Sequence, residues 1–174
     1  MKEFVIKPNE ANQRFDKYLK KLLPNAGTSF IYKMLRKKNI TLNKKKAAGN
    51  EVVVSGDVIN VFFSDETFDK FTANTSDLQA EFEALAKLDL SGIEIVSETT
   101  DVLVASKPAN MLSQKAVDTD ISANERLIGY LINTNQLSFD DFKTFKPSVC
   151  NRLDRNTTGL ILMGKTLNGL QTLS

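Results

Sequence analysis

Residues 150–166, CNRLDRNTTGLILMGKT, contain two overlapping patterns that predict different structures and different chemistry. From Gly159 to Thr166 the spacing G-x-x-x-x-G-K-[ST] is that of a phosphate-binding loop, whose backbone N–H groups surround an anion. The four middle residues, LILM, are bulky and apolar, so their exposure around an anion would be unfavourable. They fit a buried strand, and only polar loop residues precede Gly159. We interpret the match as fortuitous and keep a nucleotide-binding protein as an alternative.

The second pattern is a single carboxylate, Asp154, between Arg152 and Arg155 in a polar loop. Neighbouring positive charge favours the ionised form, and an ionised carboxylate can attack an electron-poor carbon such as the anomeric carbon of a nucleoside. The same residues equally fit a salt-bridged aspartate that organises a tight turn, with Thr157 and Thr158 bonded to backbone. The residues alone leave both interpretations open.

The composition excludes several classes of chemistry. The chain of 174 residues has no histidine and one cysteine, Cys150. Catalysis by histidine and a zinc site are therefore not expected, no metal is predicted, and the default compartment is a reducing cytoplasm. No apolar run approaches the roughly 20 residues of a membrane helix, so no membrane association is expected. Any catalysis would rest on carboxylates, lysine, tyrosine or hydroxyl groups.

Charge divides the chain into two parts. Residues 1–60 hold 13 Lys and Arg against 5 Asp and Glu, whereas residues 61–174 hold 10 against 16. A basic front part followed by a mildly acidic rear part predicts two units, the first of which faces a polyanion.

Apolar spacing predicts a small α/β unit in the basic part. We expect helices over 11–23 and 28–39, the second capped by Thr28 or Ser29, then a strand over 40–43 and an exposed loop over 44–50. EVVV (51–54) and VINVFF (58–63) are predicted to form a hairpin around SGD. Basic side chains on the second helix and the following loop are predicted to converge and to contact RNA phosphates rather than to be a solvated face. They are Lys33, Arg36, Lys37, Lys38, Lys44, Lys45 and Lys46.

The sequence after residue 63 indicates a linker and then a second unit. For the whole chain we expect an α+β fold. We place an RNA-binding domain at 1–63, a linker at 64–91 with a possible helix capped by Ser76, and a second domain at 92–174. In that domain we expect paired strands at 93–96 and 102–107 and a strand over 160–165. A helix begins after Ser122, where Glu125 completes a capping box.

Three ordered segments resemble one family. Residues 147–166, PSVCNRLDRNTTGLILMGKT, are similar to the catalytic motif HRLDxxTSGLLLxAKT of the RluA-type pseudouridine synthases, and VLVASKPANM (102–111) resembles the family's K-P-x-G segment. The basic part, with GDVINVFF, resembles the RNA-binding domain of ribosomal protein S-four. Asn151 replaces the motif's histidine, and the last glycine of K-P-x-G is shifted or lost at Met111.

The resemblance implies an enzyme that isomerises uridine to pseudouridine in structured ribosomal or transfer RNA. By this resemblance Asp154 is the nucleophile or base and Arg152 fills the space that the extruded uridine leaves. The turn of the loop is expected to be shaped by Asn151, Arg155, Thr157, Thr158 and Gly159. The resemblance implies no cofactor, and we expect a monomer.

The resemblance also implies that the catalytic domain is incomplete. The family's stacking tyrosine and the basic partner of its aspartate would lie beyond residue 174, so we expect a fragment that is inactive alone. An RNA-binding module without catalysis is the alternative.

Overall fold

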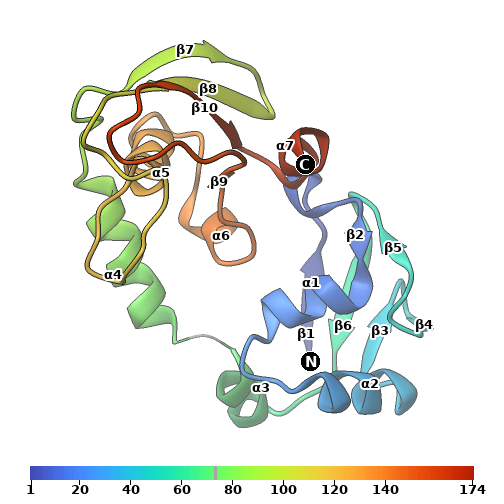
Figure 1. Cartoon of the computed structure of the whole chain (residues 1–174). Coiled ribbons are helices and arrows are strands. Elements are labelled where there is room, and N and C mark those ends of the chain that lie inside the picture. The colour runs from blue at the N-terminus through green and yellow to red at the C-terminus, as the bar shows by residue number, and fades with distance from the viewer. Residues whose placement is uncertain (73) are drawn as a thin grey trace. The chain divides into compact units, whose positions relative to one another are not determined.

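The computed structural model divides the chain into two compact units, Met1–Leu78 and Gln79–Ser174, which we call the front unit and the rear unit. The structure describes residues 1–72 and 74–174; residue 73, inside the predicted linker, lies outside the described residues. Helices and antiparallel strands occur in both units, which confirms the α+β class (Figure 1). None of the helices in the described ranges is long and apolar enough to cross a membrane.

The front unit is built on two amphipathic helices, α1 (Phe15–Leu22) and α2 (Thr28–Arg36), which follow a short 3-10 helix, η1 (Pro8–Glu10). The apolar spacing of both predicted helices is confirmed by burial. The buried side chains are Phe15, Tyr18 and Leu19 in α1 and Ile31, Met34 and Leu35 in α2. The N-cap of α2 is Gly27, one residue before the expected cap.

The front sheet has the order β1 (Lys2–Val5), β6 (Val58–Val61), β3 (Ile40–Leu42), β4 (Lys45–Lys46). The predicted hairpin of 51–54 with 58–63 is wrong, because β5 (Val52–Val53) pairs with β2 (Gln13–Arg14) while β6 pairs with β1 and β3. The hairpin lies earlier, where β3 and β4 enclose Asn43 and Lys44. Both residues have positive φ, at 51° and 62°, as a two-residue turn of this kind requires.

The polar segment after the front sheet is helical rather than a simple linker. α3 (Asp65–Phe71) starts at the N-cap Ser64, and its Phe68 stacks on Phe4 with ring centroids 5.7 Å apart. α4 (Thr75–Ala86) follows, and Ser76 lies inside it. The predicted cap at Ser76 is therefore wrong; Oδ1 of Asn74 accepts a hydrogen bond from the Ser76 N–H at 3.1 Å.

The rear unit contains one antiparallel sheet, ordered β7 (Glu94–Glu98), β8 (Val102–Lys107), β10 (Gly159–Gly164), β9 (Ser148–Val149). α5 (Ala123–Asn133) has the predicted capping box of Ser122 and Glu125. Figure 1 shows α5 on one face of this sheet, whose strands bury Leu103, Ala105, Ile161 and Met163. α6 (Phe139–Phe142), which was not predicted, and α7 (Leu167–Leu173) complete the unit.

Helix α5 approaches the C-terminal end of α4 closely at Gly129. A Cβ atom at this position would lie 2.4 Å from the Leu85 carbonyl oxygen. Side chains of α5 also supply donors to the end of α4 and the turn after it, since Asn133 Nδ2 donates to Ala86 O at 2.9 Å and Arg126 Nη1 to Asp89 O at 2.9 Å. This contact fixes the two helices within the rear unit.

We expect Gly129→Ala to lower the free energy of unfolding of the rear unit by about 1–3 kcal/mol, because the methyl group must displace helix backbone. Differential scanning calorimetry would record this as a lower midpoint. Lys87→Ala, at an exposed position of the same unit, is the control and should leave the midpoint unchanged. An unchanged midpoint for Gly129→Ala would show that α4 and α5 can move apart at this contact without a loss of stability.

Candidate active site

The apparent phosphate-binding pattern at 159–166 is a strand and the start of a helix. Residues Gly159–Gly164 form β10, which pairs with β8 along its whole length. The lysine of the pattern, Lys165, has a side chain that is 9% exposed, and its Nζ donates to Glu98 Oε1 at 2.8 Å and Thr99 O at 2.6 Å. The interpretation of the match as fortuitous is therefore confirmed, and the nucleotide-binding alternative is not supported.

The loop before β10, residues 150–158, carries Asp154, and we call it the Asp154 loop. It is anchored at its start by Asn151. The Asn151 amide donates from Nδ2 to Leu160 O at 3.0 Å and accepts through Oδ1 from Leu162 N at 2.8 Å. The β9–β10 pairing ends just before Asn151, and the Asn151 side chain takes the place of a strand backbone in bonding to β10. The sequence predicted that Asn151 belongs to the turn, but not this role.

A second segment, residues 107–114, holds the middle of the Asp154 loop. Ser113 Oγ donates to Leu153 O at 2.8 Å and accepts from Leu153 N at 3.0 Å, and Met111 N donates to Arg155 O at 3.1 Å. Asp154 therefore lies between two residues, Leu153 and Arg155, whose backbones are both fixed by the same neighbouring segment. The loop backbone thus positions the Asp154 carboxylate, for which residues 1–72 and 74–174 provide no hydrogen bond or ion pair.

Lys107, which the sequence reasoning did not single out, supports the Asp154 loop from below. Its side chain is fully buried, and Nζ donates to the carbonyl oxygens of Met111 at 2.7 Å, Pro108 at 2.9 Å and Arg155 at 3.3 Å. Burial lowers the pKa of the Lys107 ammonium group, and the negative charge of Asp154 opposes this shift. A cation thus lies within electrostatic range of Asp154. The signal was present in the K-P pair at 107–108.

The side chains of the Asp154 loop project outward. Arg152, Asp154, Arg155, Thr157 and Thr158 are all exposed. Within the described ranges no ion pair joins Asp154 to either arginine, so the salt-bridged turn considered as an alternative is not formed. The turn is closed by backbone instead, where Thr157 N donates to Asp154 O at 3.0 Å. Gly159, with φ of 149°, ends the loop in a region that favours glycine.

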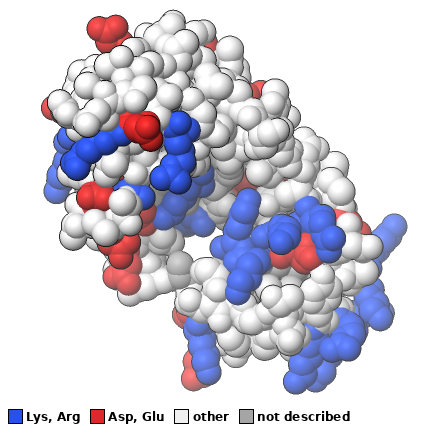
Figure 2. All heavy atoms as spheres, viewed as in Figure 1, with Lys and Arg blue, Asp and Glu red and all other residues white. Residues whose placement is uncertain are grey.

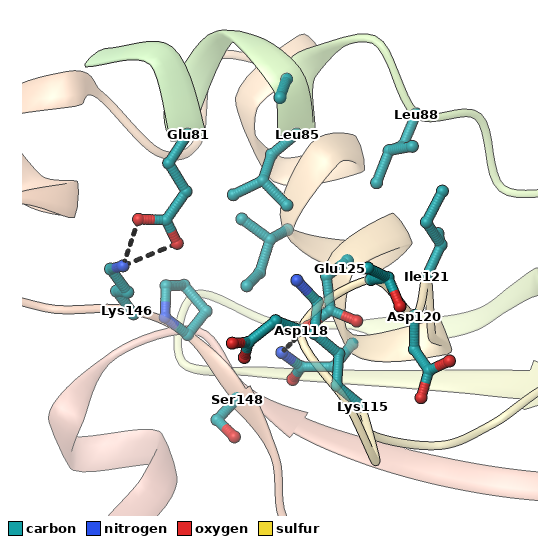
Figure 3. A pocket seen from close by; sticks show the side chains of 15 residues that line it. Glu81, Leu85, Leu88, Lys115, Asp118, Asp120, Ile121, Glu125, Lys146 and Ser148 are labelled. Carbon is teal, nitrogen blue, oxygen red and sulfur yellow. Dashed lines mark hydrogen bonds and ion pairs between the residues drawn. The ribbon is translucent and has the colours of Figure 1, made fainter. Parts of the chain in front are cut away.

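Two cavities flank residues 115–121 of the rear unit, and they differ in charge. The first, of about 400 Å³, is lined by four carboxylates and two lysines, and we call it the acidic cavity. Figure 3 shows the Glu81–Lys146 ion pair on one side of it and Lys115 and Asp118 on another. The second, of about 380 Å³, we call the arginine cavity. It is lined by Ser91, Asn110, Met111, Leu112, Thr119, Asp120, Ile121, Arg126 and Arg155. Only this one contains a residue of the Asp154 loop.

The predicted basic residues of the front unit are all exposed. Lys33 and Arg36 lie on α2, Lys37 and Lys38 follow it, and Lys44, Lys45 and Lys46 form the turn and second strand of the β3–β4 hairpin. In the part of the chain that the structure describes, none of the seven takes part in an ion pair. Figure 2 shows Lys and Arg in several groups on the visible face of the front unit.

A partly exposed hydrogen-bond network joins α1, α2 and the loop after β4. Arg14 and Tyr32 donate hydrogen bonds to the Asp16 carboxylate, at 2.8 Å for both Arg14 Nη2 and Tyr32 Oη, and they hold the pKa of Asp16 below its usual value. The Asp16 N–H donates to Gly49 O at 2.8 Å. This network fixes α2 and residues 47–51 to the same end of α1.

Comparisons with known proteins agree with this geometry. The family model of RNA pseudouridylate synthases matches residues 101–174, which include Lys107 and the Asp154 loop. An uncharacterized RNA pseudouridine synthase of Mycoplasma pneumoniae is 32% identical over 175 residues, covering 98% of this chain and 50% of its own length. The ribosomal large subunit pseudouridine synthase C of Rickettsia typhi is 31% identical over 156 residues, which cover 87% of this chain and 46% of that protein. The chain spans about half the length of the curated relatives it matches. The chain is thus similar to RNA pseudouridine synthases over nearly its whole extent, and the model of that family matches its rear part.

Proposed function

We propose that the protein isomerises uridine to pseudouridine in structured RNA, with ribosomal RNA as the first substrate to test. The observation that carries the proposal is the exposed Asp154 on a loop whose backbone is fixed on both sides of it by residues 107–114. A rigid, accessible carboxylate suits attack on, or proton removal from, an extruded nucleotide. The relative from Rickettsia typhi carries a name that refers to the ribosomal large subunit.

The chemistry assigns one role to each of three side chains. Asp154 acts as the nucleophile or base that breaks the glycosidic bond, after which the uracil turns and rejoins the ribose through C5. Arg152, exposed two residues earlier, occupies the space that the extruded nucleotide leaves in the RNA. Lys107 places a buried ammonium group under the loop and holds it through the carbonyl oxygen of Arg155. No cofactor takes part in these steps.

The direct test uses the whole protein, because the chain spans only half of its relatives. Formation of a C5 glycosidic bond displaces the hydrogen from C5, so RNA that contains 5-tritiated uridine releases tritium to water. We expect release from ribosomal RNA, measured after charcoal removal of the RNA. RNA that is retained on the protein without any release would favour a binding module over an enzyme.

The front unit is proposed to bind RNA phosphates, as an S-four-like domain, through the seven exposed cations of α2, the residues after it and the β3–β4 hairpin. We expect Lys45→Gln with Lys46→Gln to reduce the slope of log Kd against log salt by about 1.5, since each lost phosphate contact removes about 0.7–0.9. Fluorescence anisotropy with a labelled RNA hairpin gives this slope. Lys70→Gln with Lys87→Gln removes the same charge from exposed sites elsewhere and should leave the slope unchanged. Equal slopes for the two double variants would contradict the assignment.

A further inference from the structure

The arginine cavity adjoins the Asp154 loop and has the size of a small-ligand site. Its volume of about 380 Å³ lies within the range of sites that hold small molecules. Arg155, the residue directly after Asp154, contributes to its wall, and so does Met111, which fixes the Arg155 backbone. Whatever occupies this cavity therefore lies next to the proposed reaction centre.

Two guanidinium groups line the cavity and retain free donors. The Arg155 side chain is exposed, and within the described residues it forms no ion pair. Arg126 uses Nη1 to bond Asp89, at 2.7 Å to Oδ1 and 2.9 Å to the carbonyl oxygen, which orients the group. A guanidinium has five N–H donors, so most of those of Arg126 remain available. Planar paired donors of this kind suit the two oxygens of a phosphate.

The carboxylate in the wall of this cavity, Asp120, is already bonded to the backbone of residues 116 and 117. Asp120 Oδ2 accepts hydrogen bonds from Ala116 N and Val117 N, both at 3.0 Å, and closes a turn in residues 116–120. These bonds hold the pKa of Asp120 below its usual value, and Arg155 adds to the effect. The wall therefore holds two arginines, of which Arg126 is paired with Asp89, and one carboxylate that is committed to the turn, whereas the acidic cavity has four carboxylates against two lysines. Of the two, the arginine cavity is the one suited to an anionic group.

The rest of the wall is mixed, with the polar residues Ser91, Asn110 and Thr119 beside three apolar residues that can contact a nucleobase. Met111, Leu112 and Ile121 line it, and Ile121 is 51% exposed. Unpaired bases in protein–RNA complexes stack on aromatic side chains or on arginine planes, and the two guanidinium groups of this wall offer the second kind of surface. The arginines of the wall suit the phosphate of a nucleotide, and its apolar side chains suit the base.

We infer that the arginine cavity binds the RNA nucleotide next to the target uridine, with its phosphate on Arg126 and Arg155 and its base against Met111 and Ile121. The inference rests on the proposed function for the identity of the target, but its binding step does not depend on turnover. It implies that the protein contacts the sequence neighbour of the uridine as well as the uridine itself.

The test follows the side-chain Nε–Hε NMR signals of Arg126 and Arg155 in the 174-residue chain during titration with the trinucleotide UpUpU. We expect both signals to shift to saturation. The same trinucleotide with uncharged methylphosphonate linkages should bind about 10-fold more weakly at these signals. Arg14, paired with Asp16 in the front unit, is the internal reference. Signals of Arg126 and Arg155 that stay fixed while the RNA binds elsewhere would overturn the inference.

A variant and a second ligand sharpen the result. Arg155→Ala should weaken trinucleotide binding at Arg126 about 10-fold, and Arg155→Lys should restore part of it, whereas Lys143→Ala, an exposed control in the same unit, should not change it. Inorganic phosphate that shifts both signals as tightly as the trinucleotide would also overturn the inference, since the base would then contribute nothing. If the Arg126 and Arg155 signals shift as expected but no RNA releases tritium, the proposed function would be wrong. The inferred nucleotide site would still be supported.

Discussion

Asp154→Asn is expected to reduce pseudouridine formation by the whole protein by at least about 10³-fold, because an amide can neither attack the ribose nor accept its proton. The substitution preserves shape, and no hydrogen bond to the Asp154 carboxylate is lost within the described residues. The fold and the affinity for RNA should therefore remain. Tritium release gives the rate, and anisotropy gives the affinity.

A matched control separates chemistry from charge. Asp118→Asn removes one exposed carboxylate from the acidic cavity of the same unit and should keep the full rate. If Asp154→Asn turned over normally, the assignment of this carboxylate would be wrong. If both variants lost activity equally, the cause would be the charge of the rear unit rather than the Asp154 loop.

Lys107→Met is expected to lower the free energy of unfolding by about 3 kcal/mol, because methionine fills the volume but donates nothing to the carbonyl oxygens of Pro108 and Met111. The loss also frees the segment that fixes Leu153 and Arg155. We therefore expect the rate to fall by about 10²-fold, the effect of misplacing a reacting group by about 1 Å. Urea denaturation and tritium release measure the two effects.

The control for this variant is Lys87→Met, the same substitution at an exposed lysine. It should leave both the unfolding midpoint and the rate unchanged. A Lys107→Met protein with the wild-type midpoint would mean that Lys107 does not hold residues 108–111. A normal midpoint with a lowered rate would assign Lys107 to the chemistry rather than to the support of the loop.

Local patterns predicted the helices well. The apolar spacing of α1 and α2 and the capping box at Ser122 depend on residues within one or two turns of each other, so the sequence contains them directly. α3 escaped notice because its apolar residues, Phe68 and Phe71, pack on Phe4 and Phe30, which are far away in the chain. The hairpin at 51–63 was wrong for the same reason, since the partner of β5 is β2.

The sequence selects candidate site residues only as far as the motif extends. Asp154 could be selected because its neighbours are distinctive, and the resemblance supplied its role. The support of the loop could not be predicted, since Lys107 and Ser113 lie about 40 or more residues before their partners Arg155 and Leu153. Nor could the arginine cavity, whose walls come from four separate segments of the rear unit.

The anchor of the Asp154 loop by Asn151 has a consequence for how the protein responds to acidity. An imidazole, the side chain usual at this position by resemblance, gains a proton near neutrality and then offers only donors, so it could no longer accept from Leu162 N. The carboxamide of Asn151 keeps one donor and one acceptor at every physiological pH. The anchor of the Asp154 loop therefore gains no charge between mildly acidic and neutral surroundings.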